Sequence, residues 1–123
     1  MALKILLVDD ETVFRTCIRE MKFWETGEFV LSGEAGSGDE ALAVLAEREI
    51  DLVLMDVSMP GKNGIVLSEI ISRKYPGTAI IAMSSYDDYD YVREILKNGA
   101  YDYILKSRLS EEFLVLTLKN IAT

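Results

Sequence analysis

Five polar side chains stand directly after short apolar runs of this sequence: Asp9, Asp10, Asp56, Ser84 and Lys106. If they meet, three carboxylates share one site, which disfavours their full ionisation, and a single lysine does not neutralise them. Mg²⁺ suits such a site, because it binds carboxylate oxygens and keeps waters for a substrate phosphate. A carboxylate beside Mg²⁺ can attack phosphorus, while the metal and Lys106 offset charge on the transferring oxygens. These residue types indicate phosphoryl transfer onto an aspartate, with Asp56 as the best nucleophile.

Taken singly, each of these residues has a simpler explanation. An aspartate after a strand can start a turn or cap a helix. A serine pair can belong to a plain loop, and a lysine can be a solvated strand end. The chemical interpretation therefore depends on all five side chains converging at one place.

The elements predicted around these residues bring them together. The apolar runs are short and apolar on both faces, which is typical of buried parallel strands; they cover residues 5–8, 29–31, 52–55, 79–83 and 103–105. Amphipathic helical stretches alternate with them at 13–21, 37–45, 65–74, 89–98 and 110–121. The alternation predicts an α/β fold, a doubly wound five-stranded parallel sheet of order 2-1-3-4-5 with five helices on its two faces. The ligand site of such a sheet lies beyond the carboxyl ends of its strands.

Helix boundary signals support this division. Ser37 and Glu40 form a predicted capping box, and Ser110 is a predicted N-cap. Gly99 stands where a left-handed residue ends the fourth helix. Cys17 lies on an apolar stripe at helical spacing and is predicted to be a core residue. The same core role is predicted for Met55, Met59 and Met83.

Composition limits the classes of function. The 123 residues predict a single domain, 1–123, with no output domain present, and a formal net charge of −8 disfavours direct nucleic-acid or membrane contact. No apolar run approaches the roughly 18 residues of a membrane span, and the N-terminus lacks a signal-peptide layout. A lone cysteine fits a reducing, cytoplasmic location. With no histidine, the chain cannot use Ser-His catalysis, an imidazole zinc site or a phosphohistidine.

Four segments carry a resemblance to a known family. They are LVDDE at 7–11, MDVSMP at 55–60 with Gly64, MSSY at 83–86, and GAYDYILK at 99–106. In this order and spacing the chain resembles, over essentially its full length, the receiver domain of two-component response regulators. The resemblance implies the flavodoxin-like, CheY-like fold and a phosphoacceptor switch rather than an enzyme in the ordinary sense.

The resemblance also implies a role for each matching residue. Asp56 is the expected phosphoacceptor, and Lys106 pairs first with Asp56 and later with the phosphoryl oxygens. Asp10 and the main-chain carbonyl of Ser58 would bind Mg²⁺ beside Asp56. Asp9 would bind the metal directly or through water. Because the chain has no histidine, the phosphoryl donor would be a separate sensor histidine kinase.

Two further residues are expected to carry the switch. Ser84 would close its hydroxyl onto the phosphoryl group, and the rotamer of Tyr103 would follow that closure. The two-state conformational equilibrium of the surface formed by the fourth helix, fifth strand and fifth helix would then shift. A homodimer through that surface is a further expectation.

The sequence departs from the family pattern in two places. The family commonly has a proline, in a cis peptide, after the lysine that corresponds to Lys106; here Ser107 follows. A cis bond before a non-proline residue costs about 2.5–4 kcal/mol, so a trans bond or a rearranged loop is expected. Ser84 stands where threonine is usual, which keeps the hydroxyl and loses a methyl group.

Segments 23–29 and 86–92 resemble receivers attached to AraC-type DNA-binding domains, which would make the parent protein a transcriptional regulator; the alternative is a stand-alone receiver. Two other classes stay open. A pseudo-receiver would bind a partner without phosphotransfer, and absence of Mg²⁺ binding would favour it. A phosphatase with an aspartate nucleophile would turn over phosphomonoesters repeatedly.

Overall fold

The computed structural model describes residues 2–59, 61, 63–85 and 88–122. Its strands are β1 (Leu3–Val8), β2 (Phe29–Ala35), β3 (Leu52–Asp56), β4 (Ala79–Ser84) and β5 (Asp102–Leu105). Its α-helices are α1 (Thr12–Arg19), α2 (Gly38–Glu47), α3 (Gly64–Lys74), α4 (Tyr89–Lys97) and α5 (Glu111–Ala122). Two 3₁₀ turns, η1 (Lys22–Thr26) and η2 (Lys106–Arg108), complete the described chain. The strands are parallel in the order β2-β1-β3-β4-β5, so the predicted topology is confirmed.

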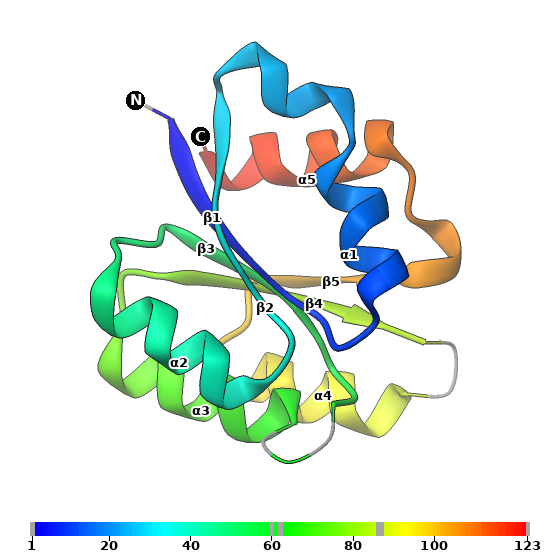
Figure 1. Cartoon of the computed structure of the whole chain (residues 1–123). Coiled ribbons are helices and arrows are strands. Elements are labelled where there is room, and N and C mark those ends of the chain that lie inside the picture. The colour runs from blue at the N-terminus through cyan, green and yellow to red at the C-terminus, as the bar shows by residue number, and fades with distance from the viewer. Residues whose placement is uncertain (1, 60, 62, 86–87, 123) are drawn as a thin grey trace.

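Helices cover both faces of the sheet (Figure 1). The alternation of side chains along β1 shows why: Leu6 and Val8 belong to one core, and Ile5 and Leu7 to the other. The first core packs under α2, α3 and α4, and the second under α1, η1 and α5. A strand buried on both sides must be apolar at every position, which is the pattern seen in the sequence.

The predicted N-caps are present in the structure. Ser37 Oγ accepts a hydrogen bond from Glu40 N at 3.2 Å, and Ser110 Oγ accepts one from Phe113 N at 3.1 Å. The Glu40 carboxylate accepts from Gly36 N at 3.0 Å, which satisfies a further amide before α2. Each cap binds an amide that its helix leaves without a partner, so these helices begin close to the predicted residues.

Two other helix ends are equally well defined. Gly99 has φ +105°, and its amide donates to Leu96 O at 3.1 Å, as predicted for the residue that ends α4. Asn63, which the sequence analysis did not single out, caps α3 by accepting from Ile65 N at 3.0 Å and Val66 N at 3.2 Å.

The second strand is longer than the apolar run suggested. β2 continues from the predicted end at residue 31 to Ala35, because it pairs with β1 as far as Val8. Residues 32–34 are half-buried and include polar types, since β2 is an edge strand of the sheet. Hydrophobicity alone therefore marked only the apolar first part of the strand.

The predicted core position of Cys17 is wrong, because this side chain is exposed. α1 packs against the sheet through Phe14 and Ile18, one turn apart, and of these Ile18 is fully buried. Val13 and Cys17 form a second apolar stripe one turn apart, and both face solvent. The apolar surface of this helix is wider than its contact with the sheet.

The peptide bond between Lys106 and Ser107 is trans, as expected for a non-proline residue. Lys106 begins η2, and its carbonyl accepts from Leu109 N at 3.2 Å. The loop after β5 is thus a tight 3₁₀ turn. Pro60, Tyr86 and Asp87 of the quoted motifs lie outside the described residues.

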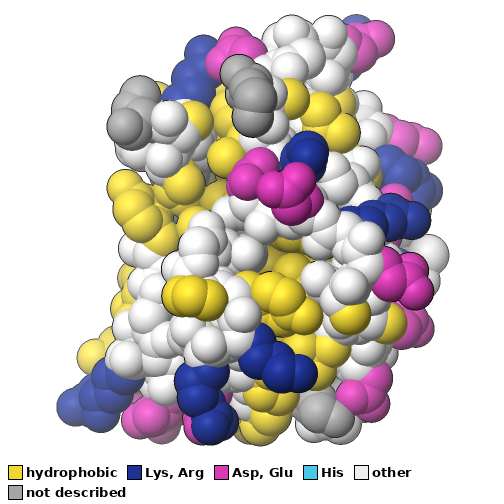
Figure 2. All heavy atoms as spheres, turned by 90° about the vertical axis from the view of Figure 1, so that its left-hand side faces the viewer, with side chains coloured by type: hydrophobic (Ala, Val, Ile, Leu, Met, Phe, Trp, Pro, Cys, Tyr) yellow, Lys and Arg dark blue, Asp and Glu magenta, His cyan; other side chains and the backbone are white. Residues whose placement is uncertain are grey.

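Among the described residues, no helix has the length and apolarity that crossing a bilayer requires. On the face drawn in Figure 2, the described acidic and basic side chains are interspersed with apolar ones instead of forming a broad basic patch. A surface of this kind lacks the concentrated positive charge that binds phosphate backbones.

Substituting Gly64 with alanine is expected to destabilise the fold by about 1–3 kcal/mol. An added Cβ would lie 2.9 Å from Val57 Cα and 3.0 Å from Val57 O, both backbone atoms with little freedom to move. Urea unfolding measures the loss. Gly77→Ala is the matched control, because a Cβ there meets nothing within 4 Å. Equal stability of the two variants would contradict this view of the contact between α3 and the end of β3.

Candidate functional site

The carboxyl ends of the strands bring the predicted side chains to one edge of the sheet. Asp9 follows β1, Asp56 ends β3 and Ser84 ends β4, and these three are 0%, 4% and 1% exposed. Lys106 follows β5 and extends its ammonium toward the aspartates. Residues 97 positions apart in the sequence, from Asp9 to Lys106, are therefore neighbours.

The Lys106 ammonium is shared among three carboxylates. Its Nζ lies 2.8 Å from Asp9 Oδ2, 2.8 Å from Glu11 Oε1 and 3.3 Å from Asp56 Oδ2. The contact with Glu11 is a hydrogen bond, whereas Asp9 Oδ2 is a close ion-pair partner with no hydrogen-bond donor of good geometry. The centroid of the Phe14 ring lies 4.4 Å from Nζ, and the ring covers the ammonium on one side.

Short turns after the strands fix the aspartates. The amide of Glu11 donates to Asp9 Oδ1 at 2.8 Å, and the amide of Ser58 lies 3.4 Å from Asp56 Oδ1. In each case the second oxygen, Oδ2, is the one directed to Lys106. The local backbone thus orients both carboxylates before any ligand is considered.

This arrangement makes Asp56 unusually hard to ionise. Burial of the carboxyl group, and to a lesser extent the neighbouring charge of Asp9, raises the pKa of Asp56 from 3.8 to about 7 against the opposing effects of Lys106 and Ser58. Burial lowers the pKa of Lys106, but its contacts with Asp9 and Glu11 outweigh that effect and raise it overall. Lys106 is therefore a permanent cation beside a carboxyl that titrates near neutrality.

Three carboxylates in this cluster could hold a metal ion. Oxygens of Asp9, Glu11 and Asp56 lie within 4.8 Å of one another. The cluster offers only oxygen ligands, and Asp9 Oδ2 is buried and accepts no hydrogen bond of good geometry, although the Lys106 ammonium lies 2.8 Å away. Both properties fit a hard divalent cation such as Mg²⁺.

The composition of this cluster differs from the predicted ligand set. Asp9 and Asp56 belong to it, but Asp10 is exposed and lies outside it. Ser58 is also exposed and contributes its amide to Asp56. Glu11, which appeared only as part of a motif, takes the third place. Its position immediately before α1, at the same edge of the sheet, was the available signal.

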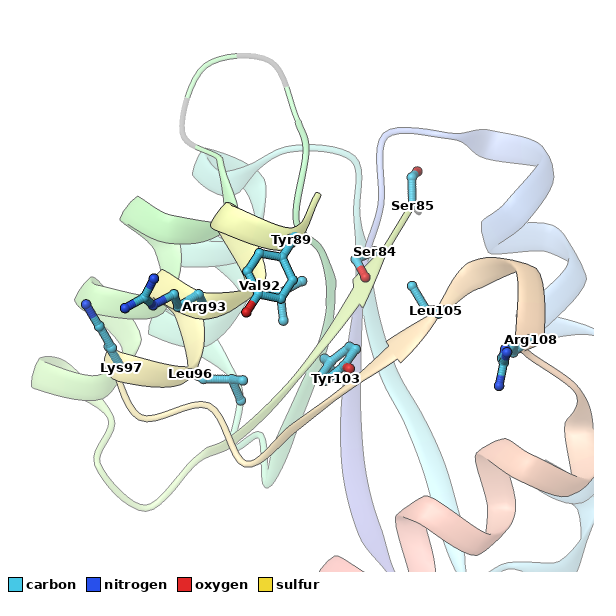
Figure 3. Close-up of a pocket in the computed structure, with 10 residues that line it drawn as sticks. All are labelled: Ser84, Ser85, Tyr89, Val92, Arg93, Leu96, Lys97, Tyr103, Leu105 and Arg108. Carbon is cyan, nitrogen blue, oxygen red and sulfur yellow. The ribbon is translucent and has the colours of Figure 1, made fainter. Parts of the chain in front are cut away.

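The two residues predicted to form the switch lie on neighbouring strands. Ser84 Oγ is buried and has no hydrogen-bond partner among the described residues, whereas Tyr103 is 43% exposed. Both line a groove of about 690 Å³ between α4 and β5 (Figure 3). Its lining combines apolar and aromatic side chains with basic ones; the other lining residues are Ser85, Tyr89, Val92, Arg93, Leu96, Lys97, Leu105 and Arg108.

The raised pKa of Asp56 predicts a pH-dependent gain in stability for Asp56→Asn. The contribution of the protonated carboxyl to stability is fully present below pH 3.8 and is lost as the pH rises through about 7. In metal-free buffer the variant should match the wild type near pH 4 and exceed it at pH 8 by about 1–3 kcal/mol. Urea unfolding across this pH range measures the difference.

Asp90→Asn is the control for this experiment, because Asp90 is an exposed acid on α4. Its effect on stability should stay below about 1 kcal/mol, as expected for an exposed acid in the first turn of a helix. An Asp56→Asn variant less stable than the wild type at pH 8 would show that the buried carboxylate is not under electrostatic strain.

Two curated regulatory proteins are similar to this chain over most of its length. The oxygen regulatory protein NreC of Staphylococcus haemolyticus is 37% identical over 115 residues, which cover 92% of this chain and 52% of NreC. The transcriptional regulatory protein DegU of Brevibacillus brevis is 29% identical over 98% of this chain and 50% of DegU. This chain thus spans about half the length of the curated relatives it matches.

A solved structure agrees over nearly the whole chain. The receiver domain of AraT, a response regulator from Geobacillus stearothermophilus, superposes with a TM-score of 0.89 at 30% identity, covering 98% of this chain and 93% of that domain. The family model described as the response regulator receiver domain matches residues 5–118. This protein belongs to the response regulator receiver domain family.

Proposed function

We propose that this chain is a phosphorylatable switch of a two-component system, which accepts a phosphoryl group on Asp56 from a sensor histidine kinase. The observation that carries the proposal is the position of Asp56, at the end of β3 and 3.3 Å from a lysine that other carboxylates keep charged. A pseudo-receiver would have no need to retain this strained cluster of acids around Lys106.

The transfer step follows from the charges of these residues. An ionised Asp56 oxygen forms a bond to phosphorus as the bond from phosphorus to the donor's imidazole nitrogen breaks, and the imidazole keeps the electron pair and is protonated by solvent. The product is an acyl phosphate on Asp56. Lys106 stabilises the negative charge on the phosphoryl oxygens, because its ammonium is already within reach of Asp56.

Mg²⁺ would neutralise further charge on the transferring phosphoryl group when bound. We propose that Asp9, Asp10 and Asp56 hold it, with the main-chain carbonyl of Ser58. Glu11 belongs to the acidic cluster of the structure but, in this proposal, serves Lys106 rather than the metal.

The response would pass through Ser84 and Tyr103. A phosphoryl group adds nearly two negative charges and new acceptor oxygens, and the unpartnered Ser84 hydroxyl can donate to them. Tyr103, which lines the adjacent groove, would then change rotamer and alter the surface formed by α4, β5 and α5. That surface is the proposed contact for an output domain or for a second copy of the chain.

The proposed output is control of transcription in the cytoplasm. Among the matched relatives are a protein named as a transcriptional regulator and another named as an oxygen regulator, and each is about twice as long as this chain. In this proposal the receiver does not contact DNA itself, which agrees with its net charge of −8. An AraC-type DNA-binding domain is the partner suggested by segments 23–29 and 86–92.

Incubation with acetyl phosphate or a phosphorylated histidine kinase should label the protein once, and only when Mg²⁺ is present. Asp56→Asn should take up no label, because the amide is not a nucleophile, and intact-mass spectrometry measures the result. Asp90→Asn is the matched control and should label as the wild type does. Full labelling of the Asp56 variant would overturn the assignment, and repeated turnover of phosphomonoesters would indicate a phosphatase instead.

Lys106→Ala should still bind Mg²⁺ but should lose the switching response. Without the ammonium, phosphorylation is expected to slow by at least about 10-fold, since one charged contact to the transferring group contributes on the order of 1.4 kcal/mol or more. Labelling kinetics measure the rate, and NMR shifts of α4 and β5 amides report the switch. A wild-type response in this variant would contradict the role given to Lys106.

A further inference from the structure

Glu11 occupies the outer side of the lysine site. Of the carboxylates that hold the Lys106 ammonium, Asp9 and Asp56 are 0% and 6% exposed at their side chains, whereas Glu11 is 64% exposed. The contact of Lys106 with Glu11 is nevertheless as short as its contact with Asp9, at 2.8 Å. Glu11 is therefore the one partner of the three that can leave Lys106 without leaving a buried charge unpaired.

The backbone of Glu11 is held while its side chain stays adjustable. Its amide donates to Asp9 Oδ1 at 2.8 Å, and it stands at the N-cap position of α1 with φ −84° and ψ 104°. Its side chain caps no helix amide, so the carboxylate is available to Lys106 alone among the described contacts. Phe14, on the first turn of α1, confines the ammonium from another side.

Phosphorylation of Asp56 would change the balance among these contacts. Nearly two negative charges would arrive on the inner side of Lys106, where the Asp56 contact is now the longest of the three, at 3.3 Å. Glu11 would then compete with the phosphoryl oxygens for the same ammonium and would also repel them. The closer Glu11 holds Lys106, the less favourable the phosphorylated state becomes.

We propose that Glu11 is a positioning residue that latches Lys106 outward in the unphosphorylated protein and releases it when a phosphoryl group occupies Asp56. The latch sets how tightly the site holds a phosphoryl group. This inference rests on the proposed function, because it concerns the lysine of that same site.

The experiment uses beryllofluoride, a phosphomimetic anion, at saturating Mg²⁺. Glu11→Gln keeps the shape of the side chain and removes its charge, so it should bind beryllofluoride about 2–5-fold more tightly than the wild type in calorimetric titration. The affinity of Glu11→Asp, whose side chain is one methylene shorter, should lie between those of Glu11→Gln and the wild type. Glu20→Gln, an exposed acid at the other end of α1, is the matched control and should not differ from the wild type.

A double-mutant cycle separates the latch from simple repulsion. In a Lys106→Met background, Glu11→Gln should change the affinity for beryllofluoride by much less than in the native background, because the latch acts through the lysine. An undiminished effect in that background would overturn the latch in favour of direct repulsion of the anion by Glu11.

Two further readouts need no phosphomimetic. In metal-free buffer, urea unfolding of the same four proteins should give a favourable coupling between Glu11 and Lys106, and its absence would overturn the ion pair. In a titration with Mg²⁺ alone, Glu11→Gln should change the affinity for Mg²⁺ by less than about threefold. A loss of affinity of 10-fold or more would make Glu11 a metal ligand instead of a latch. If the wild type binds no beryllofluoride, the proposed function itself fails. If the wild type binds it and Glu11→Gln binds it with the same affinity, only the latch fails.

Discussion

The ammonium of Lys106 beside the buried carboxylates of Asp9 and Asp56 is the interaction on which the rest of the site depends. Two carboxylates at 0% and 6% side-chain exposure have little water to stabilise them, and a lysine within 3.3 Å of both supplies the missing counter-charge. No local segment could assemble this group, because the three residues stand at the ends of three different strands. The parallel order of the sheet is what makes their ends coincide.

The site is held together at a cost in stability, and the remainder of the fold offsets that cost. Burial and the charge of Asp9 bring the pKa of Asp56 to about 7, which means that its ionised form is disfavoured in the folded protein. Two separate apolar cores, one on each face of the sheet, support the strands that carry these residues. A carboxylate kept under strain, next to a fixed cation, suits a group whose role is to accept charge and change its surroundings.

Hydrophobic patterning predicted the helices and strands well where each element has one clear environment. It placed β1, β3 and β4 to within two residues, because strands buried on both faces are apolar throughout. It predicted too short a β2, because this edge strand contains polar residues. It also wrongly predicted Cys17 to be buried, because an apolar stripe on a short helix does not reveal which side contacts the sheet. The groove between α4 and β5 could not be predicted from hydrophobic patterning. Its lining residues come from separate segments and include apolar, aromatic and basic types.

The alternation of strands and helices was sufficient to predict that Asp9, Asp56, Ser84 and Lys106 lie at one edge of the sheet, because it implies the order and direction of the strands. Which carboxylates surround Lys106 could be seen only in the folded structure. The two neighbouring acids in the turn after β1 are placed differently: Glu11 contacts the lysine, and Asp10 lies outside the cluster. The contact of Glu11 with Lys106 joins residues 95 positions apart, so the residues around Glu11 carry no signal for it.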